Sequence, residues 1–140
     1  SEMCIRDSLG RERALVVHGA GTDEIATHGT TQAWELRNGD IITYQLTPEE
    51  LGIERHELAE LAGGDGAANA LALRAVFAGR GKPAHVNAIA ATAGAMFYLN
   101  GTTRSIAAGV SHAKDLINSG AVEKWLHIHE SANYAVGEKN

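Results

Sequence analysis

Cysteine, aromatic residues and excess positive charge are scarce in this sequence, and each scarcity excludes a class of protein. The 140 residues contain one cysteine, Cys4, which excludes an internal disulfide framework and a zinc site built from several cysteines. Aromatic residues make up 5% of the chain, too few for a surface that stacks nucleic-acid bases. Lysine and arginine number 12 against 17 acidic residues, so phosphate neutralisation by a basic surface is not expected and no nucleic-acid partner is predicted.

Long hydrophobic runs are also lacking. The longest nearly apolar stretch, residues 88–99, is interrupted by Thr92 and Gly94 and is shorter than the roughly 20 residues that span a bilayer. We therefore expect a buried helix there and no membrane partner. No signal-peptide pattern is seen at the N-terminus, and we expect a cytoplasmic location.

The remaining composition, 44% hydrophobic and 21% charged, is typical of a globular domain or part of one. Residues 1–8 have no clear periodicity, and we interpret them as a non-native leader. Residues 9–135 are expected to form one unit of α/β structure, and residues 136–140 a polar tail.

The first clear element is a predicted strand at residues 13–17. Its "ALVV" run does not alternate, which favours burial on both faces and the parallel type of pairing. Two β-leaning runs follow around Asn38 and Gly39, a dipeptide typical of a tight hairpin. One apolar face of this hairpin is expected from four side chains at alternate positions: Trp34, Leu36, Ile42 and Tyr44.

From Pro48 onward the sequence predicts a cluster of helices. Asp65 is a plausible N-cap, and the helix expected at residues 83–101 is rich in small residues, so that neighbouring helices can approach it closely. The last helix is expected to turn four side chains inward: Val122, Trp125, Leu126 and His129. A doubly buried strand cannot satisfy its backbone alone, so it either pairs unusually or belongs to a sheet completed by sequence not present here.

Asp23 and Glu24 lie in the glycine-rich loop after the first strand. In open α/β sheets, ligands collect at the carboxyl ends of strands, and magnesium favours one or two carboxylates together with phosphate oxygens and water. The same residues also fit a solvated acidic turn, since acidic pairs are common on surfaces. From the residues alone both interpretations stay open.

Three other motifs carry less chemistry. "LAGGDG" at residues 61–66 is typical of a helix end followed by a cap. "AGRGKP" lacks the first glycine and the Ser or Thr of a P-loop. "HIHE" at residues 127–130 has i,i+2 spacing, which separates the two imidazole rings on a helix and does not fit a helical zinc site.

Three blocks together resemble the C-terminal part of the catalytic domain of anthranilate phosphoribosyltransferases. They are "ERALVVHGAGTDEIATHGTTQAWELRNGDIITYQLTPEELGI", "LAGGDGAANALALRAVFAGRGKPAH" and "AKDLINSGAVEKWL". The resemblance runs from about Gly10 to Tyr134. It implies an α/β fold of the nucleoside phosphorylase/phosphoribosyltransferase type, here with a parallel-type strand and β hairpin followed by a helical cluster.

The resemblance also implies a function. That family transfers a phosphoribosyl group from phosphoribosyl pyrophosphate to anthranilate in tryptophan biosynthesis, with Mg²⁺. By position, Asp23 and Glu24 match the acidic pair that binds a magnesium ion in the family. Thr22 departs from the Leu or Met usual before that pair, and Thr92 from the usual Asn of the long helix.

The family's glycine-rich Gly-Thr-Gly-Gly-Asp loop, its anthranilate-contacting arginine and its small helical dimerisation domain have no counterpart here. We therefore expect a fragment that is inactive alone, from a parent enzyme that is a homodimer. The alternatives are a related pyrimidine-nucleoside phosphorylase, a non-catalytic nucleic-acid-binding paralogue of the same fold, and an independent helical interaction domain.

Overall fold

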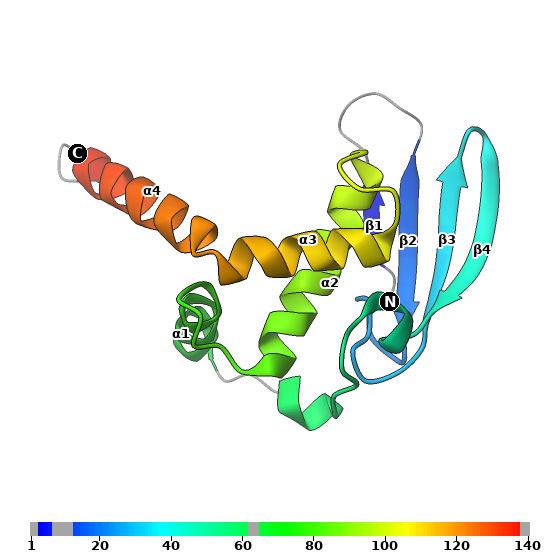
Figure 1. The fold of residues 1–140 in the computed structure, drawn as a ribbon, viewed down its shortest axis with the longest axis horizontal. Helices are drawn as coiled ribbons and strands as arrows, with labels where there is room; N and C mark the ends of the chain where they lie inside the picture. The colour runs from blue at the N-terminus through cyan, green and yellow to red at the C-terminus, as the bar shows by residue number, and fades with distance from the viewer. Residues whose placement is uncertain (1–2, 7–12, 62–64, 138–140) are drawn as a thin grey trace.

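The computed structural model describes residues 3–6, 13–61 and 65–137, with side chains described in 13–61 and 65–129. A small sheet comes first along the chain and helices follow (Figure 1). The strands are β1 (Met3–Arg6), β2 (Ala14–Gly19), β3 (Thr31–Arg37) and β4 (Asp40–Leu46). Two 3₁₀ turns, η1 (Glu49–Leu51) and η2 (Leu58–Leu61), precede the helices α1 (Gly66–Phe77), α2 (Pro83–Leu99), α3 (Ile106–Asn118) and α4 (Ala121–Gly137).

The α/β class and the order of strand, hairpin and helices are confirmed, but the expected parallel type of pairing is wrong. The sheet has the order β1-β2-β3-β4, and all three pairs are antiparallel. Burial alternates along β2, where Leu15 and Val17 are fully buried and Val16 is half-buried. The apolar run suggested burial on both faces, but Val16 alternates with the buried Leu15 and Val17 and therefore points to the opposite face of the sheet.

The hairpin itself is confirmed, with β3 and β4 joined at Asn38 and Gly39. Both residues have positive φ, 52° and 84°, as a primed two-residue turn requires. The single apolar face is wrong, because Trp34 pairs with Thr43 while Tyr44 pairs with Ala33. Directly paired residues share a face, so Trp34 and Leu36 lie on the outer side and Ile42 and Tyr44 on the helix side.

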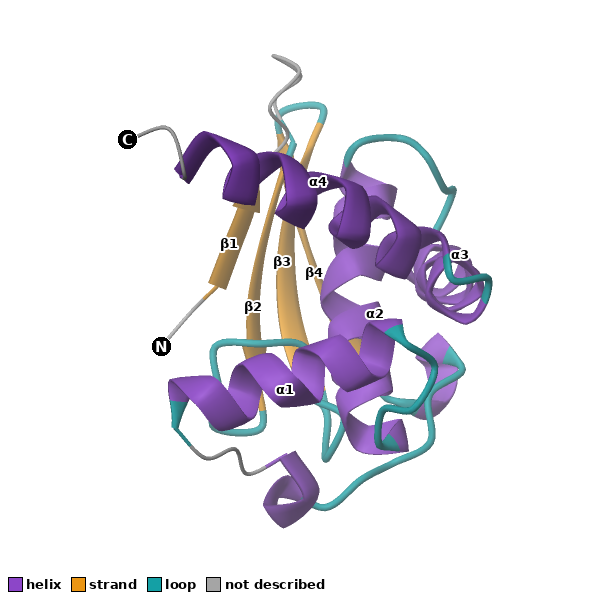
Figure 2. Cartoon of the chain, turned by 90° about the vertical axis from the view of Figure 1, so that its left-hand side faces the viewer, coloured by secondary structure: helices purple, strands orange, loops and turns teal. Residues whose placement is uncertain are grey.

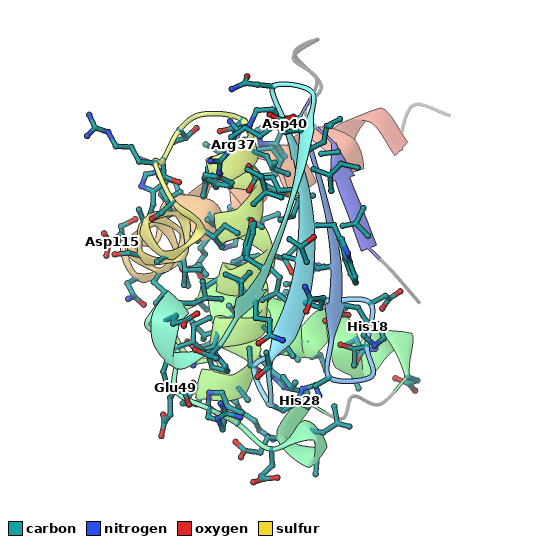
Figure 3. All side chains as sticks on the ribbon, turned by 90° about the vertical axis from the view of Figure 1, so that its right-hand side faces the viewer. His18, His28, Arg37, Asp40, Glu49 and Asp115 are labelled. Atoms are coloured by element: carbon teal, nitrogen blue, oxygen red, sulfur yellow. The ribbon has the colours of Figure 1, made fainter. Side chains whose placement is uncertain are left out.

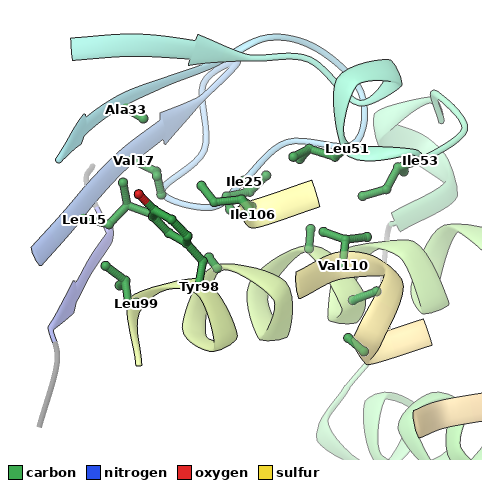
Figure 4. Close-up of a cluster of buried hydrophobic side chains, with 14 residues drawn as sticks. Leu15, Val17, Ile25, Ala33, Leu51, Ile53, Tyr98, Leu99, Ile106 and Val110 are labelled. Carbon is green, nitrogen blue, oxygen red and sulfur yellow. The ribbon is translucent and has the colours of Figure 1, made fainter. Parts of the chain in front are cut away.

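The hydrophobic core lies between the inner face of the sheet and helices α2 and α3 (Figure 4). Leu15 and Val17 of β2 meet Tyr98 and Leu99 near the end of α2. Ile25, which directly follows the acidic pair, is buried in the same cluster. The acidic loop is therefore anchored in the core from one of its own residues.

Helices α2 and α3 cross in close contact, as the small residues of the first predicted. A Cβ on Gly109 would clash with the main-chain carbonyl of Gly94, and one on Gly94 would lie 2.5 Å from the main-chain nitrogen of Val110. The two glycines thus allow backbone-to-backbone contact at the crossing. Asp65 also acts as predicted, because its side chain accepts a hydrogen bond from the Ala68 main-chain nitrogen at 2.9 Å.

The inward face expected for α4 is wrong in part. Val122 and Leu126 are half-buried, whereas Trp125 is 56% exposed and stacks on the exposed His129 with ring centroids 3.8 Å apart. The helix extends away from the sheet in Figure 1, so little of the described chain is available to cover that side. In the part of the chain that the structure describes, no helix is both long and apolar enough to cross a membrane.

Candidate functional site

Asp23 and Glu24 lie on the loop between β2 and β3, at the end of β2 (residues 20–30). Both side chains are exposed. Within the described part of the chain, neither carboxylate forms an ion pair or hydrogen bond. The pair is therefore free to bind a ligand from solution.

The turn that carries the acids is closed at its base by three hydrogen bonds. The main-chain nitrogens of Gly19 and Thr22 each donate to the other residue's carbonyl, at 3.0 and 2.9 Å. The Thr22 hydroxyl also donates to the Gly19 carbonyl at 2.7 Å. Thr22 thus adds a polar bond to the turn.

Gly19 and Gly21 are required by this geometry for different reasons. A Cβ on Gly19 would clash with the main-chain carbonyl of Glu24, so the loop folds directly over the end of β2. Gly21 has a φ of 91°, a conformation that glycine adopts without strain. Even Ala20 has a φ of 46°, which shows how tightly the chain reverses here.

Behind the acids, the loop is held by buried groups. The main-chain nitrogen of Ala26 donates to the buried Thr31 hydroxyl at 2.8 Å. The Thr27 carbonyl accepts from the main-chain nitrogen of His56 at 2.9 Å. On the exposed side, a ring nitrogen of His28 lies 3.1 Å from the Ala20 carbonyl; His18 and His28 mark this end of the sheet in Figure 3. The acidic turn therefore has a fixed base and an exposed tip.

Glu24 lines a cavity of about 640 Å³ that lies against helix α1 and the start of α2. Ala68, Ala72, Val76 and Ile89 contribute apolar walls. Three residues that can carry positive charge also line it: Arg80, Lys82 and His85. Neither Arg80 nor Lys82 was predicted as a site residue, because the segment does not fit a P-loop. Their position just before the start of α2 is the feature of the sequence that could have indicated an anion-binding role.

The donor set fits an open magnesium site. The described residues contain no group of three or more His, Cys, Asp or Glu side chains that could enclose a metal ion. Magnesium does not need such a cage, because it keeps several waters and shares one or two carboxylates with substrate phosphates. Two adjacent exposed carboxylates, of which Glu24 lines a cavity together with cationic side chains, match that requirement. The "HIHE" histidines take no part, since His127 and His129 lie on α4.

An antiparallel sheet packed on helices, with an acidic turn at a strand end, defines an α/β domain with a candidate ligand site. Residues 4–123 match the family described as "Glycosyl transferase family, a/b domain", and the chain belongs to this family. The match begins inside the segment interpreted as a leader, and Met3–Arg6 pairs with β2. The non-native origin of residues 1–8 stays a prediction.

Similar proteins carry the name of one particular enzyme within this family. The anthranilate phosphoribosyltransferase of Corynebacterium aurimucosum is 70% identical over 131 residues, which cover 94% of this chain and 38% of that protein. The enzyme of the same name from Corynebacterium diphtheriae is 61% identical over 127 residues, 91% of this chain and 37% of that protein. The chain thus spans a little over a third of the length of these relatives.

Solved structures of the same enzyme from other organisms also match this chain. The crystal structure of anthranilate phosphoribosyltransferase from Thermus thermophilus matches with a TM-score of 0.74 and 38% identity, covering 82% of this chain and 34% of that one. The Saccharomyces cerevisiae enzyme, solved in complex with PRPP and Mg, matches with a TM-score of 0.70 and 27% identity, over 81% of this chain and 33% of that one. The resemblance inferred from the sequence is confirmed.

Proposed function

We propose that this chain is part of an anthranilate phosphoribosyltransferase, in which Asp23 and Glu24 hold Mg²⁺ beside phosphoribosyl pyrophosphate. The observation that carries the proposal is the free acidic pair on a braced turn, next to a cavity lined by Arg80 and Lys82. The names of the similar proteins supply the reaction: phosphoribosyl transfer to anthranilate, a step of tryptophan biosynthesis.

In the proposed reaction the anomeric carbon exchanges its bond to pyrophosphate for a bond to the anthranilate nitrogen. A bound magnesium ion supplies charge neutralisation for the departing pyrophosphate. Asp23 and Glu24 would hold it through their carboxylates, and the hydrogen bonds of the turn keep the backbone of this loop in place. Arg80 and Lys82 add positive charge to the cavity, which favours an anionic ligand there.

The proposal assigns only part of a site to this chain. Groups that bind the ribose and anthranilate would come from the rest of the longer enzyme, since similar proteins are more than twice as long. We expect that enzyme to be a cytoplasmic homodimer. The chain by itself should therefore show no measurable transfer.

The first experiment measures transfer by the 140-residue chain with both substrates and Mg²⁺. We expect no turnover above that of the double variant Asp23→Ala, Glu24→Ala. Turnover that exceeds this control would contradict the expectation that the chain is catalytically incomplete.

The second experiment places the same double substitution in the full-length enzyme. We expect the Mg²⁺-dependent rate to fall by at least about 100-fold, because charge stabilisation of the leaving group is lost, with little change in melting temperature. The matched control is Asp115→Ala, an exposed acid on α3 away from the turn (Figure 3). A fall in thermal stability that matches the fall in rate would instead assign the pair a structural role.

A further inference from the structure

His56 is a buried histidine that the proposed reaction does not use. Its residue is 7% exposed, and it lies between η1 and η2. Both ring nitrogens have partners: Nδ1 lies 3.2 Å from a Glu60 carboxylate oxygen, and Nε2 lies 2.8 Å from the side-chain nitrogen of Asn87. Asn87, on α2, is also 7% exposed.

The chemistry of these partners assigns the proton on the ring. A carboxylate can only accept, so Nδ1 carries hydrogen and donates to Glu60. The amide nitrogen of Asn87 can only donate, so Nε2 is unprotonated and accepts. The arrangement therefore selects one neutral tautomer of His56.

The main chain of His56 reaches the acidic loop. Its nitrogen donates to the Thr27 carbonyl at 2.9 Å, three residues after Glu24. Asn87 thus holds the ring against α2, and the backbone of the same residue holds the loop. On the other side of this contact, Ile25 is fixed in the core. The backbone of residue 56 is therefore one of the groups that hold the acidic loop in place.

We propose that His56, oriented by Asn87, is a positioning residue that sets the affinity of Asp23 and Glu24 for a divalent cation. The proposal rests on the proposed function, because it deepens the role of that acidic pair. His56 does not touch the ligand and acts through the Thr27 carbonyl. Groups hydrogen-bonded directly to metal ligands typically change metal affinity by 10- to 100-fold when removed, and His56 acts one step further away, so we expect an effect at the lower end of that range.

The test uses the 140-residue chain, Mg²⁺ alone as the probe, and two substitutions. In His56→Ala the link to Asn87 is lost, so we expect amide hydrogen exchange at Ile25–Thr27 to rise and Mg²⁺ affinity to fall about tenfold. In His56→Gln the side-chain carbonyl can accept from Asn87 in place of Nε2, and we expect most of the affinity to return. His129→Ala, an exposed histidine on α4, is the matched control and should change neither quantity.

A uniform rise of exchange across α2 and α3 in His56→Ala, or failure of His56→Gln to restore the loop, would assign the residue to general stability and overturn the proposal. Nitrogen NMR of the imidazole gives an independent readout: the wild type should show the neutral tautomer with hydrogen on Nδ1, and a different tautomer would overturn the assignment. If the wild-type chain binds no Mg²⁺ at Asp23 and Glu24, the proposed metal site fails. In that case the exchange result decides only whether His56 holds the acidic loop, whereas wild-type Mg²⁺ binding that His56→Ala leaves unchanged would overturn the proposal for His56 alone.

Discussion

At the scale of single residues, a buried carboxylate with several hydrogen-bond partners lies away from the acidic turn. Glu35 of β3 is fully buried, and its carboxylate accepts hydrogen bonds from Tyr44 and Tyr98 and pairs with Arg37 at 2.8 Å. Arg37 in turn donates to the Tyr98 hydroxyl. Burial by itself would raise the pKa of Glu35, but the hydrogen bonds from Tyr44, Arg37 and Tyr98 outweigh burial and lower it. The charged form is therefore the stable one.

This pKa shift predicts how stability depends on pH. Because the pKa of Glu35 is lower in the folded chain, its charged form stabilises the fold above the ordinary glutamate pKa of about 4.5. That contribution is lost as the pH falls through the lowered value. In Glu35→Gln we expect the free energy of unfolding at neutral pH to drop by about 2 kcal/mol, and its decline with acid to become shallower. Urea unfolding across the acidic range measures both.

The control for Glu35 is Glu54→Gln, at an exposed position, which should leave the free energy of unfolding at neutral pH unchanged. Some acid dependence remains in any variant, because the pKa values of Glu49 and Glu60 are also lowered, by Arg55 and by the Glu57 backbone respectively. An unfolding curve for Glu35→Gln as steep in acid as that of the wild type would contradict the role given to this carboxylate.

At the scale of elements, the crossing of α2 and α3 depends on two glycines. We expect Gly109→Ala to lower the free energy of unfolding by about 2 kcal/mol or more, because the added methyl meets the backbone of Gly94 and the helices must separate. Gly66→Ala is the control: it lies in α1, a Cβ there meets nothing, and alanine favours the helix. Equal stability of the two variants in denaturant unfolding would mean that the helices do not pack this closely.

The same scale shows what sequence patterns can predict. The hairpin, the Asp65 cap and the small-residue helix depend on local rules, and these predictions are confirmed. The direction in which β2 pairs, and the choice of which face of β3 is buried, depend on the strands and helices that pack against them in the folded chain. Val16 and Trp34 are as apolar as core residues, and their outward direction follows from the register between strands. The acidic pair could be predicted from the resemblance to a known family. Arg80 and Lys82 are distant from it in the sequence and line the same cavity as Glu24 only in the folded chain.

At the scale of the whole molecule, the described helices lie on one side of the sheet (Figures 1 and 2). The other side presents Val16, Trp34, Leu36 and Ile41, the last 73% exposed. Contiguous apolar surface of this kind, next to the open edge of β4, favours association.

We therefore expect the 140-residue chain to self-associate as its concentration rises, as measured by sedimentation velocity. Ile41→Lys should weaken this association because a charge on the outer face opposes burial, whereas Leu71→Lys, at a 69% exposed position on α1, should not. The same substitution in the full-length enzyme tests whether the outer face is covered there. If its remaining chain covers the outer face, the substitution lowers the melting temperature there, while the 140-residue chain tolerates it. A 140-residue chain that stays monomeric at every concentration would contradict this account of the outer face.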